Sequence, residues 1–332
     1  MTDLVSYRDI SFLYIIRLSR AACAGRRVGG AVVRLLAVLA LWAAACPGLA
    51  AEDAASRALA RVPMRSVGGA LVVDVRVGEA GPFAFRLDTA AHQTAIYRRL
   101  VGRLGLDRSA SGPVTVLGTG GRRLVPRYRL GRLGIGGVEH RLDSVAALPV
   151  SADPGEPLYG VLGQDFLLRY AVELDGPGRC LRLYARRSGV PGAPGAVYDD
   201  HPLHAVTGRL VSVRARLGGT RVRALVDTGA VRSVLNPAAA QALTLAPGRA
   251  ARVTGIDGTA TSVTVTDDAL TVHLGDRALG QTRPAVGALP IFRSLGLTDA
   301  PAMILGTDLL AAHTILFDWQ AMRLRWRRPS PR

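Results

Sequence analysis

The stretches LVVDVRVGEAGPFAFRLD (residues 71–88) and LVSVRARLGGTRVRALVD (residues 210–227) decide the fold, because they are two copies of one pattern. Each alternates apolar and polar residues, passes through a turn that contains glycine, and continues as a second apolar stretch ending in aspartate. Alternation with a period of two is typical of a half-buried β-strand, and glycine between two such runs is typical of a hairpin. The internal repeat therefore predicts two similar β-rich halves.

The repeat continues beyond each aspartate. DTAAHQTAIY begins at Asp88 and DTGAVRSVLN begins at Asp227. Next, VTVLGTGG and RVTGIDGT lead into glycine-rich tips, which are typical of β-hairpins; their glycines include Gly118, Gly120, Gly255 and Gly258. The last shared motif reads L-G-x-D-x-L, in residues 162–167 and 305–310, where we expect a short helix followed by a strand.

The duplication also predicts the domain organisation. We expect one lobe over residues 60–185, a second lobe over 200–327, and between them a linker over 186–199 that is rich in proline and glycine. The predicted fold class is mainly β, with two pseudo-symmetric lobes and a cleft between them.

The first 50 residues have the composition of a targeting segment. Several arginines precede the apolar run LLAVLALWAAA (35–45), and small residues follow it. The run is shorter than the ~20 residues that span a bilayer, and it matches the core of a signal peptide. We expect an exported protein, periplasmic or secreted. Two variants stay open: Cys46 as the site of a lipid anchor, and Arg26-Arg27 as part of a twin-arginine signal.

Composition narrows the possible partners. The formal net charge is +17, and all 42 basic residues are arginines scattered along the chain, which favours a solvated basic surface. A face for nucleic acid or membrane lipid is the alternative. Aromatic residues make up only 5 %, too few for a stacking platform, so we expect no nucleic acid partner. Beyond the leader Cys180 stands alone, and no cysteine or histidine cluster has metal-ligand spacing.

Asp88 and Asp227 are the candidate reactive residues. Each ends an apolar strand, where a buried charge is costly for a purely structural residue. If the halves pack about a pseudo-twofold axis, the two carboxyl groups meet about 3 Å apart, share one proton and have split pKa values. Such a pair can take a proton from water and polarise a carbonyl group, without a metal or an organic cofactor.

The residues around the aspartates have expected supporting roles. Thr89 and Thr228 should turn their hydroxyl groups toward the opposite lobe and brace the pair, and Gly229 should let the backbone approach a substrate. The two glycine-rich hairpins should close over an extended peptide, which binds by adding a strand.

These residues resemble the retroviral-type aspartic peptidases, and more specifically their bacterial exported relatives. The resemblance rests on Asp227-Thr228-Gly229-Ala230, the glycine-rich hairpins and Ile304-Leu305-Gly306 before a helix, and it covers about residues 65–327. It implies retropepsin-like β-barrel lobes fused in one chain, so that a monomer suffices. It also implies hydrolysis of a peptide or protein substrate, with Asp88 and Asp227 as the catalytic residues. Ser233 belongs to the same pattern, and Thr94 is its counterpart.

Ala90 departs from the family pattern, which has glycine at this place. Two functions therefore stay open: an active aspartic endopeptidase, and a peptide-binding module that keeps the fold without catalysis. Both aspartates favour the enzyme, and Ala90 favours the binding module.

Other polar residues near the motifs receive plainer interpretations. We expect Asp165 and Asp308 to cap the short helices, with catalysis as the alternative. Asp175 and Asp318 should end strands, and His92 is a candidate to line a substrate pocket.

Overall fold

The structure is a computed structural model that describes residues 57–118, 121–149, 156–186, 192–193, 195–207, 209–255 and 258–328. All of these residues belong to one compact unit. The predicted targeting segment with Cys46, and Gly120 in the first hairpin, lie outside the described residues. Within these ranges no helix is both long enough and apolar enough to cross a membrane.

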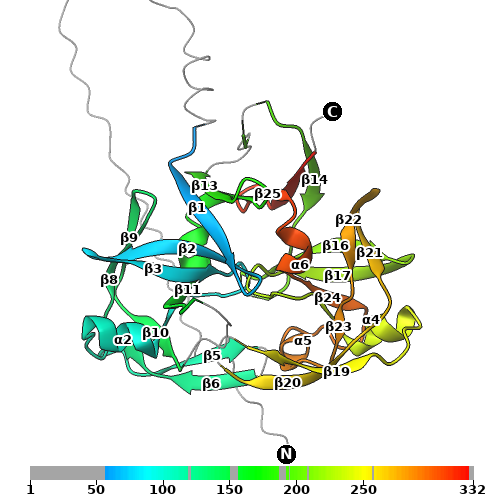
Figure 1. Ribbon diagram of the computed structural model, residues 1–332, viewed down its shortest axis with the longest axis horizontal. Coiled ribbons are helices and arrows are strands. Elements are labelled where there is room, and N and C mark those ends of the chain that lie inside the picture. The colour runs from blue at the N-terminus through cyan, green and yellow to red at the C-terminus, as the bar shows by residue number, and fades with distance from the viewer. Residues whose placement is uncertain are drawn as a thin grey trace, which may run out of the picture. The chain divides into compact units, whose positions relative to one another are not determined.

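Strands dominate the first half of the chain, residues 57–186 (Figure 1). Its elements are β1 (Ala60–Val67), β2 (Ala70–Val77), β3 (Ala80–Leu87), β4 (Ala95–Tyr97), α2 (Arg98–Leu104), β5 (Val114–Gly118), β6 (Gly121–Val125), β7 (Arg127–Tyr128), β8 (Gly131–Ile135), β9 (Val138–Leu142), β10 (Val145–Leu148), β11 (Gly160–Leu162), α3 (Gln164–Leu167), β12 (Tyr170–Asp175) and β13 (Cys180–Ala185).

The second half, residues 192–328, repeats most of this order. Its elements are β14 (Tyr198–Pro202), β15 (His204–Ala205), β16 (Val211–Leu217), β17 (Thr220–Val226), β18 (Val234–Leu235), α4 (Pro237–Ala242), β19 (Arg249–Thr254), β20 (Ala260–Val265), β21 (Leu270–Leu274), β22 (Arg277–Thr282), β23 (Ala285–Val286), α5 (Pro290–Ser294), β24 (Ala302–Leu305), α6 (Thr307–Leu310), β25 (Thr314–Asp318) and β26 (Arg323–Arg327).

The repeated stretches form the two hairpins that end in the candidate aspartates. In β16, Val213, Ala215 and Leu217 are buried while the residues between them are exposed, as the alternating pattern predicts. The turn to β17 consists of Gly218 and Gly219, both with positive φ (47° and 87°), a conformation that glycine adopts without a steric penalty. β2 and β3 form the equivalent hairpin in the first half.

The L-G-x-D-x-L motifs place a second strand beside each aspartate. β11 runs parallel to β3, and β24 runs parallel to β17. As a result the backbone N–H of Asp88 donates to Leu162 O at 3.1 Å, and that of Asp227 donates to Leu305 O at 3.0 Å. Each aspartate therefore leaves its strand at a fixed point next to a short helix.

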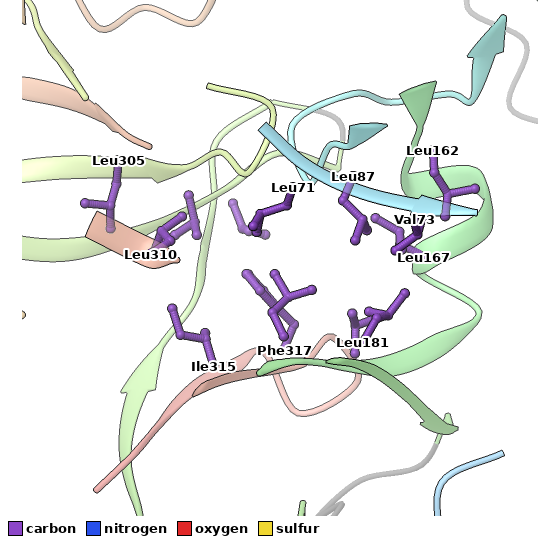
Figure 2. Close-up of a cluster of buried hydrophobic side chains, with 14 of the residues drawn as sticks. Leu71, Val73, Leu87, Leu162, Leu167, Leu181, Leu305, Leu310, Ile315 and Phe317 are labelled. Carbon is purple, nitrogen blue, oxygen red and sulfur yellow. The ribbon is translucent and has the colours of Figure 1, made fainter. Parts of the chain in front are cut away.

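A sheet made by both halves supports the two hairpins. Its strand order β14-β26-β25-β12-β13-β1 brings β12 of the first half directly against β25 of the second, with Val172 opposite Phe317. Figure 2 shows the apolar core between this sheet and the hairpins. Leu87 and Leu162 of the first half and Leu305 and Phe317 of the second are fully buried in one cluster. This shared core fixes the two halves relative to each other.

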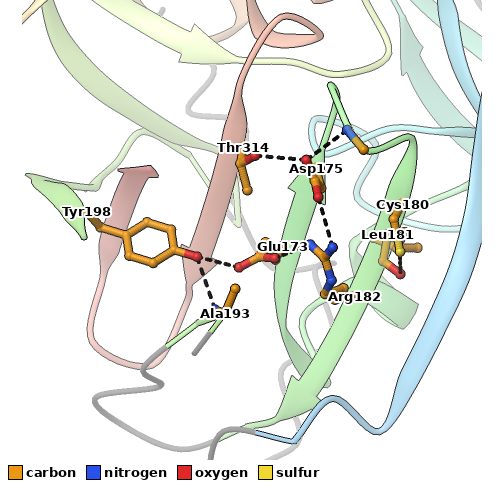
Figure 3. Close-up of polar contacts among 9 residues, drawn as sticks. Glu173, Asp175, Cys180, Leu181, Arg182, Ala193, Tyr198 and Thr314 are labelled. Carbon is orange, nitrogen blue, oxygen red and sulfur yellow. Dashed lines mark hydrogen bonds and ion pairs between the residues drawn. The ribbon is translucent and has the colours of Figure 1, made fainter. Parts of the chain in front are cut away.

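A buried polar cluster crosses the same sheet (Figure 3). Arg182 on β13 forms ion pairs with Glu173, whose side chain is 0 % exposed, and with Asp175. The hydroxyl group of Tyr198 donates to Glu173 at 2.6 Å, and that of Thr314 donates to Asp175 at 2.9 Å. The cluster thus joins β12 and β13 to strands of the second half. Burial and the bond to Glu173 raise the pKa of Tyr198.

The mainly β class with two pseudo-symmetric lobes is confirmed. Asp175 and Asp318 end β12 and β25, as predicted. The bounds of the lobes and of the linker stay predictions, because strands from both sides of the linker share one sheet.

Candidate active site

Asp88 and Asp227 meet at one cavity of about 300 Å³ between the halves. Asp88 is buried and Asp227 is half-buried, and the negative charge of Asp88 raises the pKa of Asp227 across the interface. The lining also includes Ala90 and Gly229, the residues two positions after each aspartate. The structure therefore brings together the two residues that the duplicated sequence singled out.

The backbone after each aspartate holds its carboxyl group in place. Asp88 Oδ1 accepts from the N–H groups of Ala90 and Ala91, at 2.9 and 2.7 Å. Asp227 Oδ1 accepts from Gly229 and Ala230, at 2.8 and 3.2 Å. An aspartate that caps its own turn in this way has little rotational freedom, so the second oxygen of each group keeps a fixed direction.

Thr89 and Thr228 connect the two halves crosswise. The Thr89 hydroxyl donates to Val226 O at 2.9 Å and accepts from Thr228 N–H at 3.1 Å. The Thr228 hydroxyl donates to Leu87 O at 3.1 Å and accepts from Thr89 N–H at 3.0 Å. All four bonds are buried, where an unsatisfied partner would be costly, so they keep the two turns in register. Both threonines thus lie where their predicted bracing role needs them.

Gly229 and Ala90 occupy equivalent positions with different surroundings. A Cβ atom added at Gly229 would overlap the Asp88 carboxyl group, so the backbone at 229 passes directly against that aspartate. The methyl group of Ala90 lines the cavity and packs against an apolar cluster of the second half that includes Leu225. A side chain therefore has room at position 90 and has none at position 229.

Thr94 and Ser233 tie the aspartate loops to the short helices. Asp165 Oδ1 accepts from the N–H and hydroxyl groups of Thr94, at 2.8 and 2.6 Å. Asp308 Oδ1 accepts from the same groups of Ser233, at 3.0 and 2.7 Å. Both hydroxyl groups are fully or almost fully buried, so these bonds fix the loops from behind.

The prediction that Asp165 and Asp308 cap the helices is wrong. The N-cap residues of α3 and α6 are Gly163 and Gly306, with no side-chain cap bond. The two aspartates lie inside the first helical turn, and their carboxylates bond the neighbouring loop, which offers a hydroxyl and an N–H group together.

Two hairpins reach the cavity from the side opposite the shared sheet (Figure 1). β5 pairs with β6, and β19 pairs with β20. Gly118 at the end of β5 and Gly255 after β19 both line the cavity, whereas Gly258 lies in the turn with φ of 81° and does not line it. The predicted hairpins are thus present, and they line the cavity on the side away from the shared sheet.

Burial sets the protonation of the pair. It raises the pKa of Asp88 and, together with the charge of Asp88, raises the pKa of Asp227 to about 7. The guanidinium group of Arg86 opposes both shifts, because a nearby cation favours the ionised carboxylate. Since the carboxyl groups interact strongly, the two protons belong to the pair.

Arg86 is a site residue that sequence reasoning missed. It is buried at 8 % exposure, lines the cavity, and donates from Nη1 to Gly229 O at 2.9 Å across the interface. Its equivalent two residues before Asp227 is Leu225. The feature that could have revealed Arg86 in the sequence is its charge inside the apolar run FAFRL, residues 83–87.

Gln164 was missed as well, although it stands at the variable position of the L-G-x-D-x-L motif. Its Nε2 group donates to Thr89 O at 2.7 Å and to Arg209 O at 3.0 Å. The equivalent Thr307 donates to Gly69 O at 2.8 Å. His92, in contrast, is exposed and does not line the cavity, whereas its counterpart Val231 does.

The fold and the paired aspartates define a two-lobed protein of the aspartic proteinase class. The family model described as "Aspartyl protease" matches residues 73–166 and 213–309, together more than half of the chain. The chain therefore belongs to the aspartyl protease family, and the predicted resemblance is confirmed.

A solved structure supports the fold. The aspartic proteinase from Irpex lacteus is 15 % identical, with a TM-score of 0.51 over 81 % of this chain and 97 % of that one. The comparison with curated proteins found no match.

Proposed function

We propose that this protein is an aspartic endopeptidase, which hydrolyses peptide bonds with a water molecule activated by Asp88 and Asp227. The observation that carries the proposal is the meeting of one carboxyl group from each half in a single cavity, fixed by the crosswise bonds of Thr89 and Thr228.

The pair can perform both halves of the proton transfer. When it holds one proton, the ionised carboxylate takes a proton from water, and the oxygen of that water attacks the scissile carbonyl carbon. The protonated carboxyl group donates a hydrogen bond to the carbonyl oxygen. A proton then reaches the amide nitrogen, and the C–N bond breaks. The raised pKa of Asp227 keeps the shared proton bound up to about neutral pH.

The cavity suits an extended peptide with apolar side chains. Its floor carries the aspartates, and its roof includes Leu117 and Gly118 from one hairpin and Thr254 and Gly255 from the other. Between them the second half contributes mostly apolar side chains, among them Leu210, Leu225, Val263, Leu289 and Ile304. We therefore expect preference for apolar residues on the side of the peptide that faces the second half.

A peptide-binding module without catalysis is the second candidate. Ala90 favours it, because the methyl group narrows the cavity beside the pair where family members have glycine. In that case the same cavity would hold a peptide without cleaving it.

Incubation of the purified protein with a peptide library from acidic to neutral pH distinguishes the two candidates. The replacements Asp88→Asn and Asp227→Asn keep the shape of the site and remove the shared proton. We expect each to lower cleavage by roughly 10²–10⁴-fold. Asp143→Asn, at an exposed aspartate, is the matched control and should cleave as the wild type does. Binding without cleavage at every pH would reject the enzyme.

A further inference from the structure

Four arginines share the outer, exposed face of the hairpin β16–β17, whereas the opposite face of the hairpin is apolar and buried. Arg214 and Arg216 project from β16, Arg221 and Arg223 from β17, and all four are exposed. We call these four residues the arginine face.

The register of the hairpin places these arginines in two directly opposed pairs. Arg214 lies opposite Arg223, and Arg216 lies opposite Arg221. Side chains directly opposite on an antiparallel pair have Cβ atoms about 4.5–5.5 Å apart, and like charges there destabilise the sheet. The arrangement therefore has an electrostatic cost unless an anion lies between the guanidinium groups.

No acidic side chain provides that anion among the residues that the structure describes. None of the four arginines forms an ion pair there, whereas Arg65 pairs with both Asp74 and Glu156. The nearby Asp276 also forms no ion pair with the arginine face within these residues.

The equivalent hairpin of the first half has no such cluster of arginines, so the duplicated fold forms without one. Counted back from the aspartates, Arg223 corresponds to Ala84 on β3, and the residue opposite Ala84 is Asp74 on β2. Asp74 is paired there with Arg65. The basic character of this face is thus particular to the second half.

The arginine face also borders a hollow. A cavity of about 510 Å³ is lined by all four arginines together with His273 and Gly275, and it shares no lining residue with the cavity of the aspartates. His273 stands opposite Arg216 in the sheet. Its Nδ1 atom is buried and has no hydrogen-bond partner within the described part of the chain.

We propose that the arginine face binds a soluble phosphate chain, that is, a ligand with two or more adjacent phosphate groups. The planar guanidinium group matches phosphate oxygens in a bidentate manner. Arginines two residues apart on a strand are spaced by about 6.6–6.8 Å, so a chain of phosphates can contact both opposed pairs, whereas one small anion contacts one pair. A hollow admits such a chain more readily than the flat surface of a bilayer.

Calorimetric titration with inorganic tripolyphosphate at physiological ionic strength tests the proposal. The wild type should bind, and the double replacement Arg214→Gln with Arg223→Gln should weaken binding by at least about tenfold, because it removes two charge-assisted contacts. Arg98→Gln with Arg99→Gln on α2 removes the same charge from another exposed site, and it should bind as the wild type does. If the first variant does not fold, Arg216→Gln with Arg221→Gln replaces it.

Three outcomes would overturn the proposal. The first is no binding of tripolyphosphate by the wild type at millimolar concentration. The second is equal weakening in the α2 control, which would mean that only the net charge matters. The third is arginine-dependent binding to vesicles of anionic phospholipid without binding of tripolyphosphate, which would assign the face to a membrane surface.

Discussion

At the residue scale, position 229 has less space than its equivalent, position 90. Since a methyl group at 229 would overlap the Asp88 carboxyl group, Gly229→Ala must displace the pair. We expect Gly229→Ala to lower kcat/KM by about 10²-fold or more, in line with the effect of small misplacements of reacting groups. Ala90→Gly, the reverse change at the equivalent position, should keep kcat/KM within a few-fold. Equal effects of the two replacements would contradict the asymmetry.

Arg86 offers a second prediction at the same scale, on pH dependence. The guanidinium group lowers the pKa of both aspartates, so its removal must raise them. In Arg86→Leu, which copies Leu225, both limbs of the kcat/KM–pH profile should move to higher pH, starting from a basic limb near the pKa of about 7 of Asp227. Arg86→Lys keeps the cation and should keep the limbs near their wild-type positions. A profile unchanged in Arg86→Leu would show that Arg86 does not act on the pair.

Duplication explains which site residues could be predicted. Asp88 and Asp227, and Thr89 and Thr228, occur at matching places in both copies, and repetition marked them. The counterpart of Arg86 is the apolar Leu225, and the counterpart of Gln164 is Thr307. Because these residues differ between the two copies, comparing the copies did not mark them as site residues. The role of Asp165 was misjudged because its bonding partner, Thr94, is remote in sequence.

At the element scale, the hairpins were predictable because glycine turns and alternation are local signals. The sheet that joins β12 to β25 was not, since pairing between strands so far apart leaves no trace in local periodicity. The opposed arginines of β16 and β17 follow from register, which the two-residue turn fixes.

The register yields a stability prediction. Arg223→Glu places a carboxylate opposite Arg214 and replaces repulsion by attraction, so we expect the free energy of unfolding to rise by about 0.2–1 kcal/mol. Urea denaturation at low salt measures the difference. Because the chain is strongly basic, Arg99→Glu on α2 serves as a control for net charge. A gain in the control as large as that in Arg223→Glu would contradict the pairwise origin.

At the scale of the whole molecule, the shared sheet couples the stability of the halves. Arg182→Leu would leave Glu173 as a buried charge without its cation, so we expect a loss of about 3–5 kcal/mol in the free energy of unfolding. Because the sheet contains strands of both halves, unfolding in urea should remain a single transition, with the same midpoint by far-UV circular dichroism, which reports both halves, and by fluorescence of Trp319 and Trp326 in the second half.

Arg61→Leu is the matched control for this replacement. Arg61 lies opposite Arg182 in the same sheet and is exposed, so its loss should change stability by no more than about 0.5 kcal/mol. A separate early transition for one half, or a mild effect of Arg182→Leu, would show that the buried cluster does not hold the halves together.

Because β12 and β25 belong to one chain, the site can change in a way that two identical chains do not allow. In an assembly of two identical chains every substitution enters twice, so an arginine beside one aspartate would be accompanied by an arginine beside the other. Here a single mutation alters one wall alone, as Arg86 and its equivalent Leu225 illustrate. Covalent linkage thus lets each side of the cleft acquire its own chemistry while the symmetric frame beneath it is kept.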